Sequence, residues 1–232
     1  GPDSPAKEVT KEDANLYYPA GPPYMGTVKD MYEIALKWVE FVPHVHAQYP
    51  HLLAEMYAYC VAAAHLGLRH QLVDSLMISN TGANGEGWPL LDDIPNEDMC
   101  GFAMNVGEED HAFPGVVHLC QRYSVGEDWF FGKRKFPPNY YECSHPLSVE
   151  PPSDLATQFT FKRPPNAPDR KELPPKIINR EAFMVCFLTK LVNEASAFYK
   201  KQACPEGKGN FKKTFRLVEL FGQYKKRKEA SS

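Results

Sequence analysis

The sequence predicts a mixed α/β fold in which a few short strands pack on three main helices. Apolar residues recur at helical spacing in three segments, residues 28–42, 50–65 and 179–204. Short apolar and aromatic runs between them are typical of strands. Ten prolines lie between Phe136 and Pro175, so residues 136–176 are predicted to form a proline-rich wrapping segment without long regular elements.

Residues 1–15 are polar and show no periodicity, which predicts a flexible arm before a main domain at residues 16–204. The first main helix is expected to begin after Thr27, a plausible N-cap. Pro43 is expected to close this helix near residue 42. The pair His44 and His46 then falls in a predicted polar turn, although a metal-chelating pair on a strand is the alternative.

The second helix is predicted from about Pro50 to His65, with Gly67 as its C-cap. A strand is predicted over residues 69–79, followed by a long loop at 80–114. The segment "GVVHLC", residues 115–120, is predicted as a short buried strand, and "YSVGEDWFFGKRKF" as another extended piece with aromatic bulk.

The third helix is predicted to begin at Asn179, which would act as its N-cap. The proline-rich segment before it needs apolar anchors, and four aromatic residues are candidates: Tyr140, Tyr141, Phe159 and Phe161. Residues 205–232 form a predicted basic tail that contains the run "KKRK" at 225–228.

Hydrophobic residues make up 43% of the chain and charged residues 24%, as in soluble globular proteins. No apolar run reaches the roughly 18 residues needed to span a bilayer. The formal net charge is −3, and no nucleic-acid partner is expected. Gly1-Pro2 is typical of the residue left after tag removal, so we expect the chain to be a part of a longer protein.

The six cysteines contain no C-x-x-C pair, which argues against a zinc ribbon. An even number permits disulfides in an oxidising compartment, but the sequence does not select a pairing. Cys60 and Cys186 lie on apolar helix faces and are also compatible with buried thiols.

Nucleotide-binding motifs are not recognised. The glycines of "NTGANGEGWP" have neither a following helix nor the lysine of a P-loop. No D-x-D metal motif occurs, and Asp92-Asp93, its nearest approach, is predicted to lie in a solvated loop.

Glu55, His118 and one of the pair Tyr57 and Tyr59 are candidates for a site, each with an ordinary structural alternative. Glu55 lies near a predicted helix N-terminus, where the helix dipole by itself favours a carboxylate, but a general base also needs such a fixed position. Tyr57 and Tyr59 point to different sides of that helix, so one can pack while the other lines a site. His118 lies within a predicted buried strand and is either a core histidine with a partner or a metal or phosphate ligand.

Five segments, taken in order, resemble plant and algal peptidyl-serine α-galactosyltransferases and hydroxyproline O-arabinosyltransferases. The longest is "LLAEMYAYCVAAAHLGLRHQLVDSLMI", which is similar to the family's W-x-x-EMYGY-x-x-A-A-x-x-x-L-x-H stretch. The others are "PAGPPYMGTVKDM", "GVVHLCQRYSVGEDWFFGK", "YECSHPLSVEPPSDL" and "KLVNEASAFYKKQAC". Together they cover roughly residues 19–204.

This resemblance implies the C-terminal, acceptor-side half of a GT-A-like glycosyltransferase. It implies that Glu55 orients or deprotonates the acceptor and that His118 completes a metal site for Mn²⁺. Tyr57, Trp129 and Lys133 are then implied to bind substrate. The implied partners are a UDP-sugar and a serine- or hydroxyproline-containing peptide, in the lumen of the endoplasmic reticulum or Golgi. The chain alone is expected to be inactive without the missing N-terminal half.

The alternative is a catalytically inactive glycosyltransferase-like module that acts as a structural or interaction subunit of a larger assembly. The lack of D-x-D is compatible with it, as is Leu119-Cys120 where the family has Tyr-Gly. On the enzymatic hypothesis, Glu55 and His118 are expected to converge on one pocket.

Overall fold

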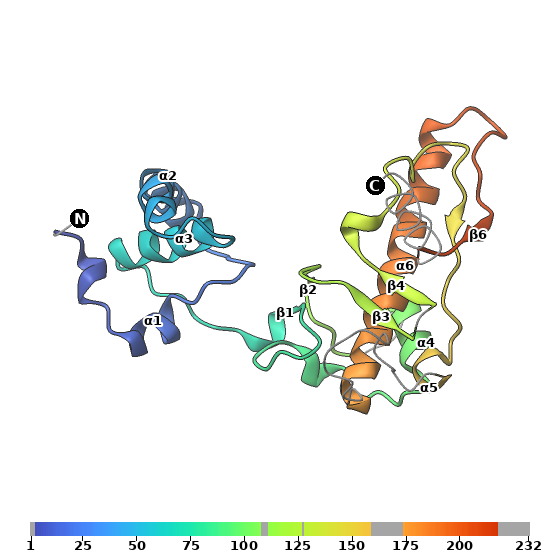
Figure 1. Cartoon of the computed structure of the whole chain (residues 1–232), viewed down its shortest axis with the longest axis horizontal. Helices are drawn as coiled ribbons and strands as arrows, with labels where there is room; N and C mark the ends of the chain where they lie inside the picture. The colour runs from blue at the N-terminus through green and yellow to red at the C-terminus, as the bar shows by residue number, and fades with distance from the viewer. Residues whose placement is uncertain (1–2, 108–110, 127, 159–173, 218–232) are drawn as a thin grey trace, which may run out of the picture. The chain divides into compact units, whose positions relative to one another are not determined.

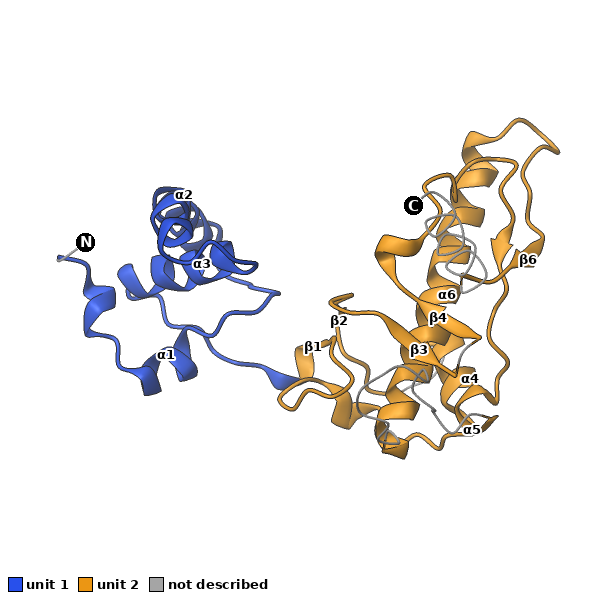
Figure 2. Cartoon of the chain, in the orientation of Figure 1, with its two compact units in different colours: residues 1–74 blue, residues 75–232 orange. Residues whose placement is uncertain are grey.

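The computed structural model describes residues 3–107, 111–126, 128–158 and 174–217, and the chain divides into two compact units. These units are residues 1–74 and 75–232 (Figure 2). Their boundary lies inside the region that the sequence assigns to one domain, 16–204. Each unit has its own hydrophobic cluster. None of the helices within the described ranges is both long and apolar enough to cross a membrane.

The first unit contains four helical elements: η1 (Pro5–Glu8), α1 (Lys11–Tyr17), α2 (Val28–Gln48) and α3 (Ala54–His65). Residues 5–15, predicted within a flexible arm, thus form η1 and most of α1. Ser4 and Thr10 cap these two short helices. The Ser4 hydroxyl also lies 2.9 Å from Nδ1 of His65, which ties the start of the chain to the end of α3.

Helix α2 begins where the sequence predicts and ends later. The Thr27 hydroxyl accepts a hydrogen bond from the Asp30 amide at 3.1 Å, which confirms the N-cap. The predicted end at Pro43 is wrong, because α2 continues to Gln48 with Pro43 inside it. His44 and His46 therefore lie in the last turns of a helix and not in a polar turn. The proline removes one backbone donor, and packing of α2 on α3 offsets this cost.

Helix α3 begins at Ala54, four residues later than predicted, because Leu53 adopts a left-handed backbone conformation with φ 83°. At its end, the prediction of Gly67 as the capping residue is confirmed, because Gly67 has a left-handed φ of +67°. The Gly67 amide donates to the Ala64 carbonyl at 3.2 Å, and the Leu68 amide donates to the Ala63 carbonyl at 3.0 Å. These two bonds form a Schellman motif, for which glycine is preferred.

In its described residues, the second unit is built on one long helix and three pairs of short strands (Figure 1). Its strands are β1 (Met77–Ile78), β2 (Val116–Val117), β3 (Tyr123–Val125), β4 (Trp129–Phe131), β5 (Leu147–Ser148) and β6 (Lys213–Phe215). β1–β2 and β5–β6 are parallel, and β3–β4 is an antiparallel hairpin. Its helical elements are η3 (Trp88–Leu90), α4 (Met99–Met104), η4 (Lys133–Lys135), α5 (Leu155–Gln158) and α6 (Pro175–Ala203), while η2 (Asp74–Leu76) crosses the unit boundary.

Helix α6 contacts α4, β3 and β4, and it supplies much of the core of this unit (Figure 1). It begins at Pro175, directly after Pro174, because proline at the first helical position loses no hydrogen bond. Asn179 is therefore a buried residue inside the helix, and its prediction as the N-cap is wrong.

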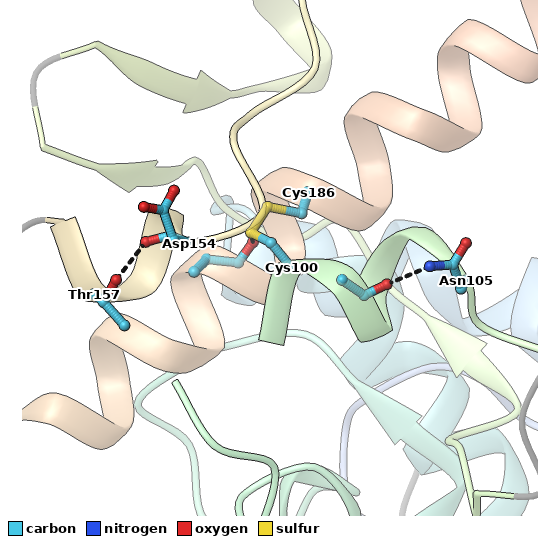
Figure 3. The surroundings of a disulfide bond; sticks show 7 residues. Cys100, Asn105, Asp154, Thr157 and Cys186 are labelled. Carbon is cyan, nitrogen blue, oxygen red and sulfur yellow. Dashed lines mark hydrogen bonds between the residues drawn. A yellow bond between two sulfur atoms is a disulfide. The ribbon is translucent and has the colours of Figure 1, made fainter. Parts of the chain in front are cut away.

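The predicted loop at 80–114 contributes several residues to the core and contains the short helices η3 and α4. Trp88, Leu91, Met99 and Cys100 are fully buried in the hydrophobic cluster around α6. Figure 3 shows the disulfide between Cys100 of α4 and Cys186 of α6. Cys186 is therefore not a buried thiol, whereas Cys60 is free and half-buried.

The proline-rich segment is held to α6 by one aromatic anchor, one polar residue and a disulfide. Tyr140 is buried, and Asn193 of α6 exchanges two hydrogen bonds of 2.9 Å with the backbone of Ser148. A second disulfide joins Cys143 to Cys204.

Of the other predicted anchors, Tyr141 is exposed. Phe159 and Phe161 lie outside the described residues, as does the basic run at 225–228. The described part of the tail contributes β6, which pairs with β5.

Candidate functional site

The parallel pair β1–β2 places two polar segments at one edge. Because both strands run in the same direction, residues 79–81 and 118–121 leave the sheet at the carboxyl ends of β1 and β2. The His118 amide donates to the Ile78 carbonyl at 2.9 Å. The Tyr123 hydroxyl lies 2.8 Å from the Ser79 carbonyl and 3.2 Å from the His118 carbonyl, so it holds the two segments together. Carboxyl edges of parallel strands are where α/β proteins commonly bind ligands.

The loop after β1 is fixed by Glu86. Its carboxylate accepts hydrogen bonds of 2.6 Å from the Ser79 amide and from the Ser79 hydroxyl. It also accepts one of 3.0 Å from the indole of Trp88. Gly87 closes the loop by donating to the Met77 carbonyl at 2.8 Å, and a Cβ there would meet Pro114 at 2.9 Å. The loop is therefore held in one conformation.

A buried ion pair lies behind this loop. Nε and Nη2 of Arg180 donate to the two oxygens of Asp92, each at 2.8 Å, and Nη1 donates to the Thr81 carbonyl at 2.8 Å. The side chains of Arg180 and Asp92 are only 8% and 12% exposed. Burial opposes ionisation of Asp92, but hydrogen bonds and charge from Arg180 and Lys176 outweigh it and lower its pKa. Asp92 is therefore not in a solvated loop, contrary to the prediction.

Glu181 connects the same loop to β3. One carboxylate oxygen accepts from the Thr81 hydroxyl and the other accepts from the Ser124 amide, each at 2.7 Å. The Thr81 oxygen in turn accepts from the amide of Gln121 at 3.3 Å. Burial raises the pKa of Glu181 and outweighs these two hydrogen bonds, which act in the opposite direction.

We predict that Glu181 makes the second unit less stable as the pH rises. The raised pKa means that the folded protein binds the proton of Glu181 more tightly than the unfolded chain does. Its contribution to the free energy of unfolding is therefore full below the unfolded pKa of about 4.3 and is lost as the pH rises through the folded pKa. Urea unfolding of Glu181→Gln across this range should show a shallower fall than the wild type. The control is Glu194→Gln, an exposed residue on the same helix, and equal slopes in all three proteins would contradict the prediction.

The edge itself presents the imidazole of His118 and the side-chain amide of Gln121, whereas Thr81 is 3% exposed and its hydroxyl bonds Glu181 and Gln121. Such groups donate and accept hydrogen bonds without carrying a fixed charge, which suits a hydroxylated ligand. His118 is half-buried and not enclosed as predicted, and no hydrogen bond of its ring is found among the described residues. Within those residues no group of three His, Cys, Asp or Glu side chains could hold a metal ion. The Mn²⁺ site implied at His118 stays a prediction.

Trp129 and Lys133 lie at the β3–β4 hairpin of the same unit. Trp129 packs in the hydrophobic cluster and is 8% exposed, with the guanidinium of Arg216 4.5 Å from the centre of its ring. Lys133 is exposed in the short helix η4 that follows β4. Their implied contacts with substrate stay predictions.

Glu55 and Tyr57 lie in the first unit, near the start of α3. Glu55 is exposed in the first turn, and its backbone carbonyl accepts from the indole of Trp38 at 2.7 Å. Among the described residues its carboxylate has no hydrogen-bond or ion-pair partner. Tyr57 is exposed and packs edge-on against Tyr49 at 5.3 Å, whereas Tyr59 is buried. The two tyrosines therefore differ in burial, as their spacing predicts.

The structure thus groups the predicted site residues by unit. Glu55 and Tyr57 share the start of one helix, while His118, Trp129 and Lys133 belong to the second unit. The convergence of Glu55 on His118 stays a prediction.

Sequence reasoning missed Glu86, Arg180 and Glu181 as organising residues. A signal for the last two exists, because adjacent charges within the apolar start of a long helix need buried partners.

Comparison of the chain with protein-family models, curated proteins and solved structures finds no match. The functional conclusion consequently depends on the residues, their geometry and the ordered resemblance described above.

Proposed function

We propose that this chain is the acceptor-side part of a peptide O-glycosyltransferase. It would act on serine or hydroxyproline hydroxyls of secreted or wall proteins, with a UDP-sugar as donor. The ordered resemblance of five segments supports this proposal. The main structural support for the proposal is the disulfide between Cys143 and Cys204, which joins two of these segments, residues 141–155 and 190–204.

Further contacts connect the same two segments. The side chain of Asn193, within 190–204, bonds both the amide and the carbonyl of Ser148, within 141–155. The Lys200 ammonium, also within 190–204, donates to the carbonyl of His145, within 141–155, at 2.5 Å. These two resembling segments therefore pack against each other within the second unit.

The two disulfides support a secretory location. Disulfides form and persist in oxidising compartments such as the lumen of the endoplasmic reticulum. Cys100–Cys186 lies in the hydrophobic core, and Cys143–Cys204 links the proline-rich segment to the end of α6. We propose that the parent protein acts in the lumen of the endoplasmic reticulum or Golgi.

In the proposed reaction, Glu55 accepts the proton of the acceptor hydroxyl. The acceptor oxygen forms a bond to the anomeric carbon of the sugar, and the bond from that carbon to the UDP oxygen breaks, so UDP leaves. The exposed position of Glu55 at the start of α3 supports this role, since its carboxylate is accessible and its backbone is fixed by Trp38. On the second unit, His118 and Gln121 would bind hydroxyl groups. A divalent metal would supply charge neutralisation for the departing diphosphate.

We predict that Glu55→Ala in the parent protein lowers sugar transfer at least tenfold, because the acceptor hydroxyl loses its proton acceptor. Transfer of radiolabelled sugar to a serine- or hydroxyproline-containing peptide measures this. Glu12→Ala is the matched control, since Glu12 is also an exposed acid in the first turn of a helix of the same unit. Unchanged transfer by Glu55→Ala would remove this residue from the mechanism.

Calorimetric titration of the parent protein with UDP-sugars and Mn²⁺ tests the function itself. Saturable binding of a UDP-sugar, together with transfer to peptide, is the expected result. A folded parent protein that binds no UDP-sugar and transfers none would contradict the enzymatic proposal. That result would favour the alternative, a glycosyltransferase-like module that serves as a subunit of a larger assembly.

A further inference from the structure

Helix α2 has two apolar faces, and only one of them is used within its unit. The used face packs on α3 and contains residues at spacings of three and four: Met31, Ile34, Trp38 and Phe41. The opposite face also carries apolar side chains at helical spacing. A globular protein normally exposes charged and polar residues on that side of a surface helix.

The unused face, here called the outer face of α2, consists of Val28, Tyr32, Ala35, Leu36, Val39 and Pro43. All six residues are exposed, and the four largest among them are Val28 at 89%, Tyr32 at 65%, Leu36 at 56% and Val39 at 75%. The outer face runs over most of α2, a helix of 21 residues and about 31 Å in length. A contiguous apolar stripe of this kind marks an interaction surface more often than scattered apolar residues do.

Charged residues border the outer face on one side in an alternating order. Lys29, Glu33, Lys37 and Glu40 follow one another along α2 at spacings of four, four and three. They form ion pairs within the helix, Lys29 with Glu33 at 3.9 Å and Lys37 with Glu40 at 2.8 Å. Their order is positive, negative, positive, negative.

Read in the opposite direction, this order of charges places an opposite charge at each position. When two copies of α2 lie antiparallel, the N-terminal half of one faces the C-terminal half of the other, and equivalent borders meet. Lys29 of one copy then faces Glu40 of the other, and Glu33 faces Lys37, so that every charge meets an opposite charge. The apolar residues lie within two positions of the same register, since Val28 then faces Pro43 and Tyr32 faces Val39.

We propose that the outer face of α2 binds a second copy of this chain in an antiparallel, two-fold symmetric dimer. Leu36 lies near the two-fold axis, where it meets the equivalent region of the partner copy. A pair of single helices buries an area at the low end of protein interfaces, so the dimer is expected to dissociate on dilution into the micromolar range.

Analytical ultracentrifugation of the full chain over a concentration series tests the dimer. The wild type should show a reversible monomer–dimer equilibrium. Leu36→Glu should weaken self-association at least tenfold, because two like charges meet at the axis. Leu16→Glu in α1 is the matched control, since Leu16 is 54% exposed, close to the 56% of Leu36, but lies off the outer face. It should dimerise as the wild type does.

A charge exchange tests the register. Glu33→Lys and Lys37→Glu each place two like-charged pairs across the antiparallel dimer, and each alone should weaken self-association by about tenfold. An equimolar mixture of the two variants should recover the wild-type affinity, because the mixed dimer again pairs opposite charges at both places. Far-UV circular dichroism checks that α2 stays helical in each variant.

Any of three results would overturn the proposal. One is a wild-type chain that stays monomeric at the highest soluble concentration. The others are a dimer that is unaffected by Leu36→Glu and one in which mixing the two charge variants restores nothing. The last result would show association in another register or through another surface.

Discussion

Replacing Arg180 with alanine should lower the free energy of unfolding of the second unit by about 3–5 kcal/mol. The guanidinium donates hydrogen bonds to both carboxylate oxygens of Asp92 and to the Thr81 carbonyl. It also lies 5.1 Å from the centre of the Trp88 ring. Its removal leaves the Asp92 carboxylate with the exposed Lys176 as its remaining ionic partner among the described residues. The loop after β1 loses one of its fixed points at the same time.

Lys176→Ala is the matched control for Arg180→Ala. Lys176 reaches the same carboxylate at 2.8 Å, but its side chain is 57% exposed, so its removal should cost less than about 1 kcal/mol. Urea unfolding in a Trp38→Phe background measures both effects, because the remaining tryptophans, Trp88 and Trp129, belong to the second unit. Equal losses for the two variants would contradict the assignment of a buried, organising ion pair.

Replacing both Cys143 and Cys204 with serine should lower the free energy of unfolding of the second unit by about 4 kcal/mol. The bond closes a sequence separation of 61 residues, and its removal releases the corresponding chain entropy in the unfolded state. Urea unfolding without reductant measures this loss, because Cys100–Cys186 then stays intact in the folded and the unfolded protein.

Cys120→Ser is the control for this disulfide, because Cys120 is an exposed, free cysteine of the same unit. It should leave the free energy of unfolding within about 0.5 kcal/mol of the wild type. A disulfide variant as stable as Cys120→Ser would show that the contacts of Tyr140 and Asn193 alone hold the proline-rich segment to α6.

Local signals in the sequence predicted the helix ends that depend on local chemistry. Thr27 and Gly67 act through hydrogen bonds to residues within a few positions, so their roles are visible in the sequence. Pro43 misled the prediction because the continuation of α2 depends on packing against α3, which lies outside the local pattern. Pro174-Pro175 was an available signal for the true start of α6.

Strands and core contacts depend on partners that are distant in the sequence. Of the predicted strand 69–79, only Met77 and Ile78 pair, because β2 offers two residues to bond with. The predicted loop at 80–114 contains Trp88 and Cys100, whose burial requires α6 nearly a hundred positions later. The site shows the same limit, since Glu181 and Arg180 acquire their roles only when Thr81 and Asp92 lie beside them.

The two disulfides interleave along the chain, since Cys143 lies between Cys100 and Cys186 and Cys204 lies after both. A pulling force on the two termini would therefore travel from Cys100 directly to Cys186 through sulfur. The segment between these cysteines, which spans a sequence separation of 86, would be excluded from the extensible length, a shortening of up to about 300 Å at roughly 3.5 Å per residue. Oxidation thus sets how far this protein can be stretched, and reduction would release the hidden length.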